Sequence, residues 1–178
     1  MAEIIAIVNE ADEVIGSVEK EKFDKTTGQI YRTASLFLFD KQGRILIQRR
    51  AFSKKTAGGK WDFSAAAGHV AFHENYLECI ARETEEELGL KGLDFFEIKK
   101  EFVRTEQGKR RFVAYFLAVA DFSINDLKLP ENEVAEVKLL TVLELRDMFK
   151  NHREEFADYS TPDFAEIAKC FLKMAEKS

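Results

Sequence analysis

The sequence predicts one domain with a mixed α/β (α+β) fold, in which helices cover two sides of a mixed β-sheet. Short runs of β-branched and aromatic residues recur along the chain and are separated by turn residues. Three other stretches carry apolar residues at helical spacing. A chain of 178 residues suits a single domain with a full core. We therefore divide residues 1–178 into an N-terminal hairpin (1–28), a core (29–150) and a C-terminal helix (161–176).

The N-terminal part of the chain supplies two predicted hairpins. Residues 3–9 and 13–18 are β-rich runs on either side of a polar turn. Residues 30–39 and 45–48 are apolar runs joined by a second turn, and we expect them to be the central paired strands. Because both runs are almost continuously hydrophobic, both faces of these strands should be buried.

Residues 68–90 are predicted to form one helix that is entered from a glycine turn. At 100° per residue, one stripe of this helix faces the core. Gly89 suits the left-handed conformation that ends a helix. The residues of the expected core-facing stripe are Leu77, Ile80, Ala81, Thr84 and Leu88.

The C-terminal part alternates strands and helices. Residues 95–104 and 109–122 read as two strands of a hairpin. Residues 136–140 read as a strand that leads into a helix capped by Thr141. Thr161 is placed to cap the last helix, which is amphipathic and which we expect to pack on the domain.

The composition excludes several classes of protein. Hydrophobic residues make up 46% and charged residues 33%, as in soluble globular proteins. A net charge of −5 argues against binding to nucleic acid polymers or to anionic membranes, and no apolar run is long enough to span a membrane. Cys79 and Cys170 have no paired spacing, so neither a disulfide framework nor a zinc site is expected. The N-terminal apolar run has acidic flanks, unlike a signal peptide, and we expect a cytoplasmic protein.

Three glutamates on the 68–90 helix form the candidate metal site. Glu83, Glu86 and Glu87 stand at i, i+3 and i+4, so they share one face, where like charges repel. A divalent cation such as Mg²⁺ takes carboxylate oxygens as ligands and would remove this repulsion. A glutamate-rich face taken alone is usually only a solvated face.

The spacing of the charged residues is more specific than their number. Gly68 is followed by Glu74 after five residues, by Arg82-Glu83 after seven more, and then by Glu86-Glu87 and Gly89. This pattern resembles the signature of the Nudix hydrolases, G-x5-E-x7-R-E-U-x-E-E-x-G-U, in which U is aliphatic. The one departure is Thr84, which is nearly isosteric with valine and is suited to the core if its hydroxyl bonds to a carbonyl one turn earlier.

The resemblance implies a Nudix-like α/β/α sandwich and an enzyme that hydrolyses a diphosphate linkage in a small molecule. The implied metal site comprises Glu83, Glu86 and Glu87 together with Gly68, and the expected cofactor is Mg²⁺, with Mn²⁺ as the alternative. Arg82 would orient a neighbouring glutamate by an ion pair, and Glu74 would support the ligands from behind. The general base is a box glutamate or a loop residue, for which Glu133 is the candidate.

A basic loop precedes this helix and supplies candidate substrate-binding residues. It carries Arg49, Arg50 and Lys54, around a Gly-Gly turn that leads into the strand-like residues 61–66. Arginine suits bidentate contact with phosphate, and lysine supplies a point charge. A solvated loop is the plain alternative, and among the cations we rank Arg50 and Lys54 first.

A second resemblance, to the isopentenyl-diphosphate isomerases, gives the main rival function. The segments SKK…W, GH and ENEV resemble that branch of the fold, which needs a cysteine before the GH pair and histidine metal ligands. Here Ala67 stands at the cysteine position and Tyr31 at a histidine position, while His69, Glu131 and Glu133 are present. Alanine carries no proton, and a phenol is a poor ligand for Mg²⁺, so we favour the hydrolase.

A third hypothesis is a catalytically silent Nudix-fold module that binds a nucleotide. Its mark would be a loss of box carboxylates, and none is lost. The substrate itself stays open between a nucleoside diphosphate derivative and another small organic diphosphate. Dimers are common in the family, so a homodimer is an open expectation, although no stretch of the sequence identifies an interface.

Overall fold

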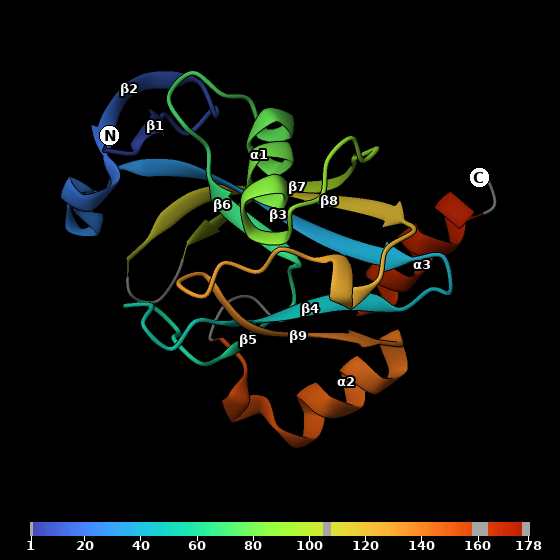
Figure 1. Ribbon diagram of the computed structural model, residues 1–178. Coiled ribbons are helices and arrows are strands. Elements are labelled where there is room, and N and C mark those ends of the chain that lie inside the picture. Colours follow the sequence, from blue (N-terminus) through green and yellow to red (C-terminus); the bar gives the residue numbers. More distant parts are fainter. Residues whose placement is uncertain (1, 105–107, 158–163, 176–178) are drawn as a thin grey trace.

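The computed structural model describes residues 2–104, 108–157 and 164–175 (Figure 1). The strands are β1 (Ile4–Val8), β2 (Val14–Glu19), β3 (Ile30–Asp40), β4 (Ile45–Arg50), β5 (Trp61–Asp62), β6 (Ala66–His69), β7 (Phe96–Arg104), β8 (Arg110–Ala120) and β9 (Val134–Leu140). The helices are α1 (Tyr76–Leu88), α2 (Val142–Asn151) and α3 (Phe164–Ala175). None of the described helices is long and apolar enough to cross a membrane.

Strand β3 organises the sheet because it has a neighbour along its whole length on one edge and several in turn on the other. It pairs in parallel with β8 from end to end. Its second edge is shared by β1 at residues 30–31, by β6 at residues 33–36 and by β4 at residues 38–39. Strands β6 and β4 therefore diverge on this second edge of β3. On the first edge the sheet continues from β8 into β7, and beyond the fork β4 is joined by β9 and β5.

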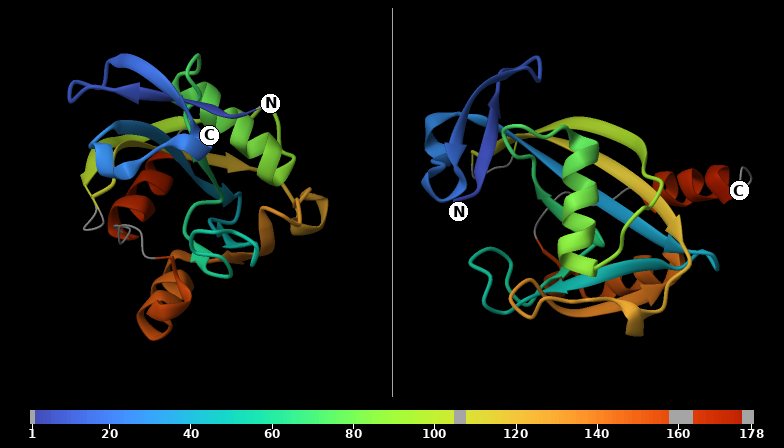
Figure 2. Two further views of the ribbon diagram at one scale, coloured as in Figure 1. Left: turned by 90° about the vertical axis from the view of Figure 1, so that its left-hand side faces the viewer. Right: turned by 45° about the horizontal axis from the view of Figure 1, so that its top comes forward.

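The two faces of β3 contribute to two different cores. Leu36 and Leu38 pack in the cluster beneath α1, whereas Phe37 and Phe39 pack in the cluster that contains residues of α2 and α3. In Figure 2 (left), α1 and α3 lie on opposite sides of the strands. The arrangement is an α/β/α sandwich with a mixed sheet, which confirms the predicted fold class. The expected burial of both faces of the central strands is confirmed as well.

Helix α1 is shorter than expected. It begins at Tyr76 behind a capping box formed by Asn75 and Glu78, and it ends at Gly89, whose φ is 73°. The prediction of one helix from residue 68 was wrong, because Gly68 belongs to strand β6 and a turn separates it from the helix. Thr84 fits the core as expected, since its hydroxyl donates a 2.6 Å hydrogen bond to the Ile80 carbonyl.

The buried face of α1 also differs from the predicted stripe. Leu77 and Ala81 are exposed, although they were placed in the core. The helix is rotated so that Cys79, Glu83 and Glu87 are buried in their place. The predicted stripe was defined from apolar residues alone. It therefore did not include two carboxylates that face the interior.

Other local predictions are confirmed within the described part of the chain. Strands β1 and β2 form the N-terminal hairpin, and Thr141 caps α2 with a capping box. The stretch 61–66 divides between two strands, β5 and β6. Helix α3 packs on the domain, since Ile167 is buried and the Phe171 ring stacks on Phe39 with centroids 4.6 Å apart. The predicted turn at 105–107 and the predicted cap at Thr161 lie outside the described residues.

Candidate active site

Helix α1 lies over the fork at which β4 and β6 diverge, and it presents two carboxylates there. Glu83 contacts Gly68 on β6, and Glu87 accepts a 2.9 Å hydrogen bond from the Gln48 side-chain amide on β4. Glu83 is 9% exposed and Glu87 is 7% exposed. Both glutamates therefore occupy the interior end of the fork, whereas the neighbouring Glu86 is exposed.

Burial makes these two carboxyl groups harder to ionise. Desolvation raises the pKa of Glu83 to about 7, although the nearby Arg82 opposes this shift. Desolvation raises the pKa of Glu87 to about 8, against the hydrogen bond from Gln48. A bound cation would favour the ionised form of both groups.

Arg82 connects the carboxylates of this motif. Its guanidinium makes a two-pronged ion pair with Glu74, with Nε 2.7 Å from Oε1 and a terminal nitrogen 3.0 Å from Oε2. The other terminal nitrogen lies 2.7 Å from Glu83 Oε1 and 3.1 Å from Glu86 Oε2. Arg82 also donates to the His69 carbonyl at 3.2 Å. The predicted orienting role of Arg82 therefore agrees with its contacts, and Glu74 stands behind it.

The donor chemistry of the three glutamates fits a hard divalent cation, because it offers only carboxylate oxygens. The three carboxylates have separate partners, since Arg82 lies between Glu83 and Glu86 while Glu87 is bonded to Gln48. Glu86 is on the exposed face of α1 and pairs with Arg82. Glu83 and Glu87 inside the fork and Glu86 outside it are the carboxylates that could hold Mg²⁺.

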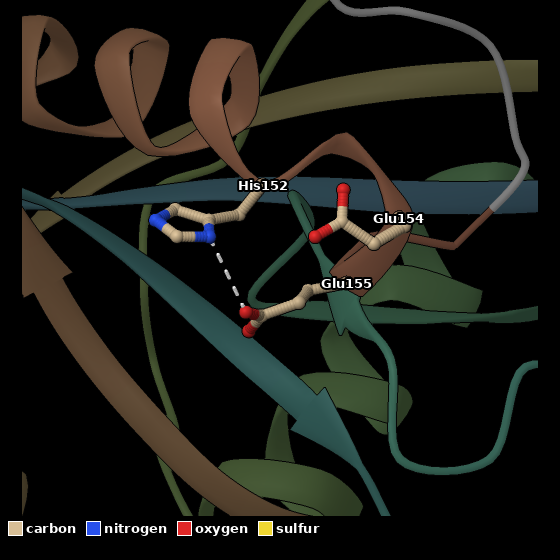
Figure 3. Close-up of side chains that lie close together, drawn as sticks. All are labelled: His152, Glu154 and Glu155. Atoms are coloured by element: carbon tan, nitrogen blue, oxygen red, sulfur yellow. Dashed lines mark ion pairs between the residues drawn. The ribbon is translucent and has the colours of Figure 1, made fainter.

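A tighter group of possible ligands lies elsewhere. In the described residues, His152, Glu154 and Glu155 bring their ligand atoms within 4.8 Å of one another (Figure 3). These side chains are exposed, follow α2 and do not line the cavity described below. Exposed acidic groups commonly occur together without an ion, and this group gives no indication of a site. His152 and His73 are exposed surface residues.

A cavity of about 1370 Å³ adjoins the glutamates. Gly68, Arg82, Glu83, Glu86 and Glu87 line it together with Arg50, Lys54, Lys55 and Glu133. The structure thus brings together every predicted site residue except Arg49. The Arg49 side chain instead donates to the Gly59 carbonyl and lies over the Trp61 and Phe52 rings, away from the lining.

Two loops meet at this cavity through a charged contact. The Lys54 ammonium pairs with the Glu133 carboxylate, and the Ala51 amide donates to the Glu133 carbonyl at 2.9 Å. Glu133 therefore reaches the site from the 130–133 loop, whereas Glu131 is exposed and is not part of the lining. Lys54, the candidate phosphate ligand, and Glu133, the candidate base, therefore neutralise each other's charge.

The sequence interpretation missed three polar residues near the glutamates. Gln48 is buried and holds Glu87, while its own Oε1 has no hydrogen-bond partner. Asp62 is buried, lines the cavity and accepts hydrogen bonds from the Ser64 amide and hydroxyl at 3.1 and 2.6 Å. A polar residue inside an otherwise apolar strand, such as Gln48 in ILIQ, is the signal that was available.

The positions that the isomerase resemblance singled out also meet in the cavity. Tyr31, Ala67 and His69 all line it, and the Tyr31 ring stacks on the His69 ring with centroids 5.2 Å apart. Burial, together with three nearby cations, lowers the pKa of His69 to about 3. His69 is therefore neutral at neutral pH, and the cysteine and second histidine of the isomerase pattern are absent.

Comparison with known proteins agrees with this geometry. A family model described as the NUDIX domain matches residues 30–160. An uncharacterised Nudix hydrolase, PA4841 of Pseudomonas aeruginosa, is 37% identical over 139 residues, which are 78% of this chain and 79% of that protein. Residues 30–160, which the family model matches, contain the fork, the cavity loops and helix α1 with its carboxylates.

Two further similarities concern the isomerase branch and the fold. An isopentenyl-diphosphate Delta-isomerase of Streptomyces griseus is 42% identical over 87 residues, which are 49% of this chain and 44% of that enzyme. The crystal structure of DR0079 from Deinococcus radiodurans superposes with a TM-score of 0.71 and 24% identity, over 94% of this chain and 98% of that one. The structural likeness supports the fold alone.

Proposed function

The chain belongs to the Nudix hydrolase family, and from this membership we propose that it is a divalent-metal-dependent hydrolase of a diphosphate linkage in a small organic molecule. The observation that carries the proposal is the position of buried Glu83 and Glu87 at a cavity that Arg50 and Lys54 also line. The substrate is a nucleoside diphosphate derivative or another small organic diphosphate. A cytoplasmic location is part of this proposal.

The metal would be held by Glu83, Glu86 and Glu87 together with Gly68. Mg²⁺ is the expected ion, and Mn²⁺ is the alternative, because both accept oxygen ligands. When bound, the ion would neutralise negative charge on the diphosphate and lower the pKa of a water molecule. Arg82 keeps Glu83 and Glu86 in position, and the Gln48 amide does the same for Glu87.

The remaining side chains bind the substrate and move the proton. Arg50 and Lys54 would bind phosphate oxygens, so that Lys54 exchanges Glu133 for the substrate. The Glu133 carboxylate is then able to accept a proton from the attacking water. The water oxygen bonds to phosphorus, the bond from phosphorus to the bridging oxygen breaks, and that oxygen leaves on the other phosphate.

The isomerase is the second candidate, and the 42% identity to an isomerase over 87 residues favours it. That chemistry needs a proton carrier where this chain has Ala67, and a metal ligand where it has Tyr31. A silent binding module is the third candidate, but it would have no reason to keep Glu83, Glu86 and Glu87. The hydrolase is therefore the proposal that all the site residues support.

The test is a substrate panel analysed by ³¹P NMR in H₂¹⁸O, with Mg²⁺ or with EDTA. The panel contains nucleoside di- and triphosphates, nucleotide sugars, dinucleotides, dinucleoside polyphosphates and isopentenyl diphosphate. We expect metal-dependent cleavage with ¹⁸O in a phosphate product. Isomerisation of isopentenyl diphosphate without ¹⁸O incorporation would overturn the proposal, and so would silence across the whole panel.

A further inference from the structure

Three polar side chains meet where strands β4 and β5 lie beside helix α1. Gln48 on β4 is directly paired with Asp62 on β5, so the two side chains point to the same face of the sheet. The Gln48 amide also donates to Glu87 Oε2 on α1 at 2.9 Å, which brings the third side chain to this pair. Three elements that are far apart in the sequence therefore contribute to one polar group inside the fork.

Each of these side chains has an oxygen atom to which no described residue donates a hydrogen bond. Gln48 Oε1 is buried and has no partner. Both hydrogen bonds to Asp62 come from Ser64 and end on Oδ1, so Oδ2 receives none from the described residues. The bond from Gln48 ends on Glu87 Oε2, and Oε1 likewise has no donor in the described part of the chain. Polar atoms in a protein interior are nearly always bonded, so three such oxygens together indicate a ligand.

The two carboxylates of this group also lack a cationic partner. Asp62 and Glu87 are each 7% exposed, and no described residue forms an ion pair with either of them. Arg82 does not serve them, because it pairs with the other glutamates of the motif. Since a buried negative charge is costly without a counter-charge, this position favours a cation.

The cations of the neighbouring 50–60 loop have other contacts or are exposed. Arg50 Nε donates to the Thr56 carbonyl at 3.2 Å, and the Lys54 ammonium pairs with Glu133. Lys55 is exposed. All three of these cations line the cavity, where a substrate phosphate is able to meet them, but none forms an ion pair with the buried carboxylates of the fork. The unpaired negative charge inside the fork is therefore not balanced from the loop.

The chemistry of the three oxygens fits a divalent cation better than a water molecule. A water molecule has two protons to donate, so it would leave one of the oxygens without a donor and both charges uncompensated. Hard divalent cations accept carboxylate and side-chain amide oxygens together. Asp62 and Glu87 line the cavity, so an ion is able to enter from solvent.

We propose that Asp62, Gln48 and Glu87 form a second divalent-cation site, in addition to the site of the motif. Glu87 belongs to both sites, whereas Glu83 and Glu86 belong to the motif site alone. The existence of the second site does not depend on the proposed function, but its contribution to turnover rests on that function. In turnover, a cation there would offset carboxylate charge that otherwise repels a diphosphate.

The binding of Mn²⁺ to the substrate-free protein tests the second site without any turnover. Mn²⁺ is titrated into the protein at neutral pH, and the free ion is counted by EPR spectroscopy. The wild type should bind two ions per chain. Asp62→Asn and Glu86→Gln should each weaken one ion by about tenfold or more, and the double variant should weaken both. If both single variants affected the same ion, the double variant would keep the other ion at wild-type affinity, and the second site would be overturned.

A substitution at Gln48 tests whether its oxygen is a ligand. Gln48→Glu adds a negative charge to the group, so it should tighten the second ion by about tenfold, although it should destabilise the metal-free protein. If Gln48 only supported Glu87 through its amide nitrogen, the same variant would lose that hydrogen bond and bind the ion more weakly. Weaker binding in Gln48→Glu would therefore contradict its role as a ligand.

The matched control is Glu101→Gln, which removes the charge of another carboxylate that lines the cavity. Glu101 lies on β7 and pairs with Lys99, so this variant should bind two ions as the wild type does. A single Mn²⁺ per wild-type chain, or two unweakened ions in folded Asp62→Asn, would overturn the second site. One ion together with metal-dependent cleavage would leave the proposed function standing. Two ions without cleavage of any panel substrate would support the second site while the proposed function loses support.

Discussion

The Glu83 carboxylate lies against the α carbon of Gly68, so that a Cβ at position 68 would stand 1.9 Å from Glu83 Oε1. This contact joins α1 to β6 at the point where the sheet divides. Gly68 has no left-handed backbone conformation, so its missing side chain serves the close approach alone. The glycine that opens the motif therefore sets the position of a carboxylate 15 residues later.

Gly68→Ala should displace Glu83 and lower kcat/KM for a diphosphate substrate by at least about tenfold, while overpacking lowers the free energy of unfolding by about 1–3 kcal/mol. Urea unfolding and metal-dependent turnover measure the two effects. Gly16→Ala is the control, because a Cβ at Gly16 meets nothing within 4 Å. Wild-type turnover in Gly68→Ala would show that the position of Glu83 is not critical.

The stability of the metal-free protein should fall as the pH rises from about 4.5 to about 8. Folding raises the pKa of Glu83 to about 7 and that of Glu87 to about 8, from the ordinary value of 4.5. The folded state therefore binds more protons than the unfolded state in this range, and stability is lost as the pH rises through the folded pKa values. The expected result is a free energy of unfolding that is clearly lower at pH 8 than at pH 5, since each pKa unit corresponds to about 1.4 kcal/mol.

Urea unfolding in EDTA at pH 5 and pH 8 measures this dependence. Glu87→Gln should flatten it and should stabilise the metal-free protein at pH 8. Glu85→Gln is the control, because Glu85 is exposed on the same helix and pairs with Lys91. A metal-free protein that is more stable at pH 8 than at pH 5 would contradict the buried state of the two carboxylates.

Arg82→Gln should raise the Mg²⁺ concentration needed for half-maximal activity and lower kcat/KM by about tenfold or more. Arg82→Lys should not restore either value, because lysine cannot make the two-pronged contact with Glu74 while also reaching Glu83 and Glu86. A Mg²⁺ titration of activity separates this positioning effect from a loss of folded protein. Normal Mg²⁺ dependence in Arg82→Gln would remove its assigned role.

Lys54→Gln and Glu133→Gln should affect different kinetic constants, although the two side chains pair in the free protein. The lysine variant should chiefly raise KM, because it loses a phosphate ligand. The glutamate variant should chiefly lower kcat, by roughly 10²–10⁴-fold if Glu133 is the general base. Steady-state kinetics on one substrate distinguish them. If both variants changed only KM, and by the same factor, Glu133 would act only as the ion-pair partner of Lys54 and not as the general base.

Local signals in the sequence were sufficient for most of the fold. The capping residue Thr141 and the terminating Gly89 act within one turn of a helix, so their neighbours in the chain predict them. The orientation of α1 was missed because Leu77 was assumed to be buried and the three glutamates were placed on a face of their own. Only the fork between β4 and β6 gives Glu83 and Glu87 an interior place, and that fork depends on pairings between distant strands.

The candidate site followed the same division. The fixed spacing from Gly68 to Gly89 identified the carboxylates and Arg82, because the motif is continuous in the chain. Gln48 reaches Glu87 from β4, and Asp62 belongs to β5, so no spacing along the sequence connects them to the motif. Residues that share only a sheet register or a cavity wall become visible once the strands are paired.

The measurement that tests the central claim most directly is Mg²⁺-dependent cleavage of the best panel substrate by the wild type, Glu86→Gln and Glu87→Gln, with each fold verified by circular dichroism. Each substitution removes one ligand charge while keeping the size of the side chain. We expect both variants to lose turnover by at least about a hundredfold, and the wild type to lose it in EDTA. Near-wild-type turnover in both folded variants would contradict a metal-dependent hydrolase at this site.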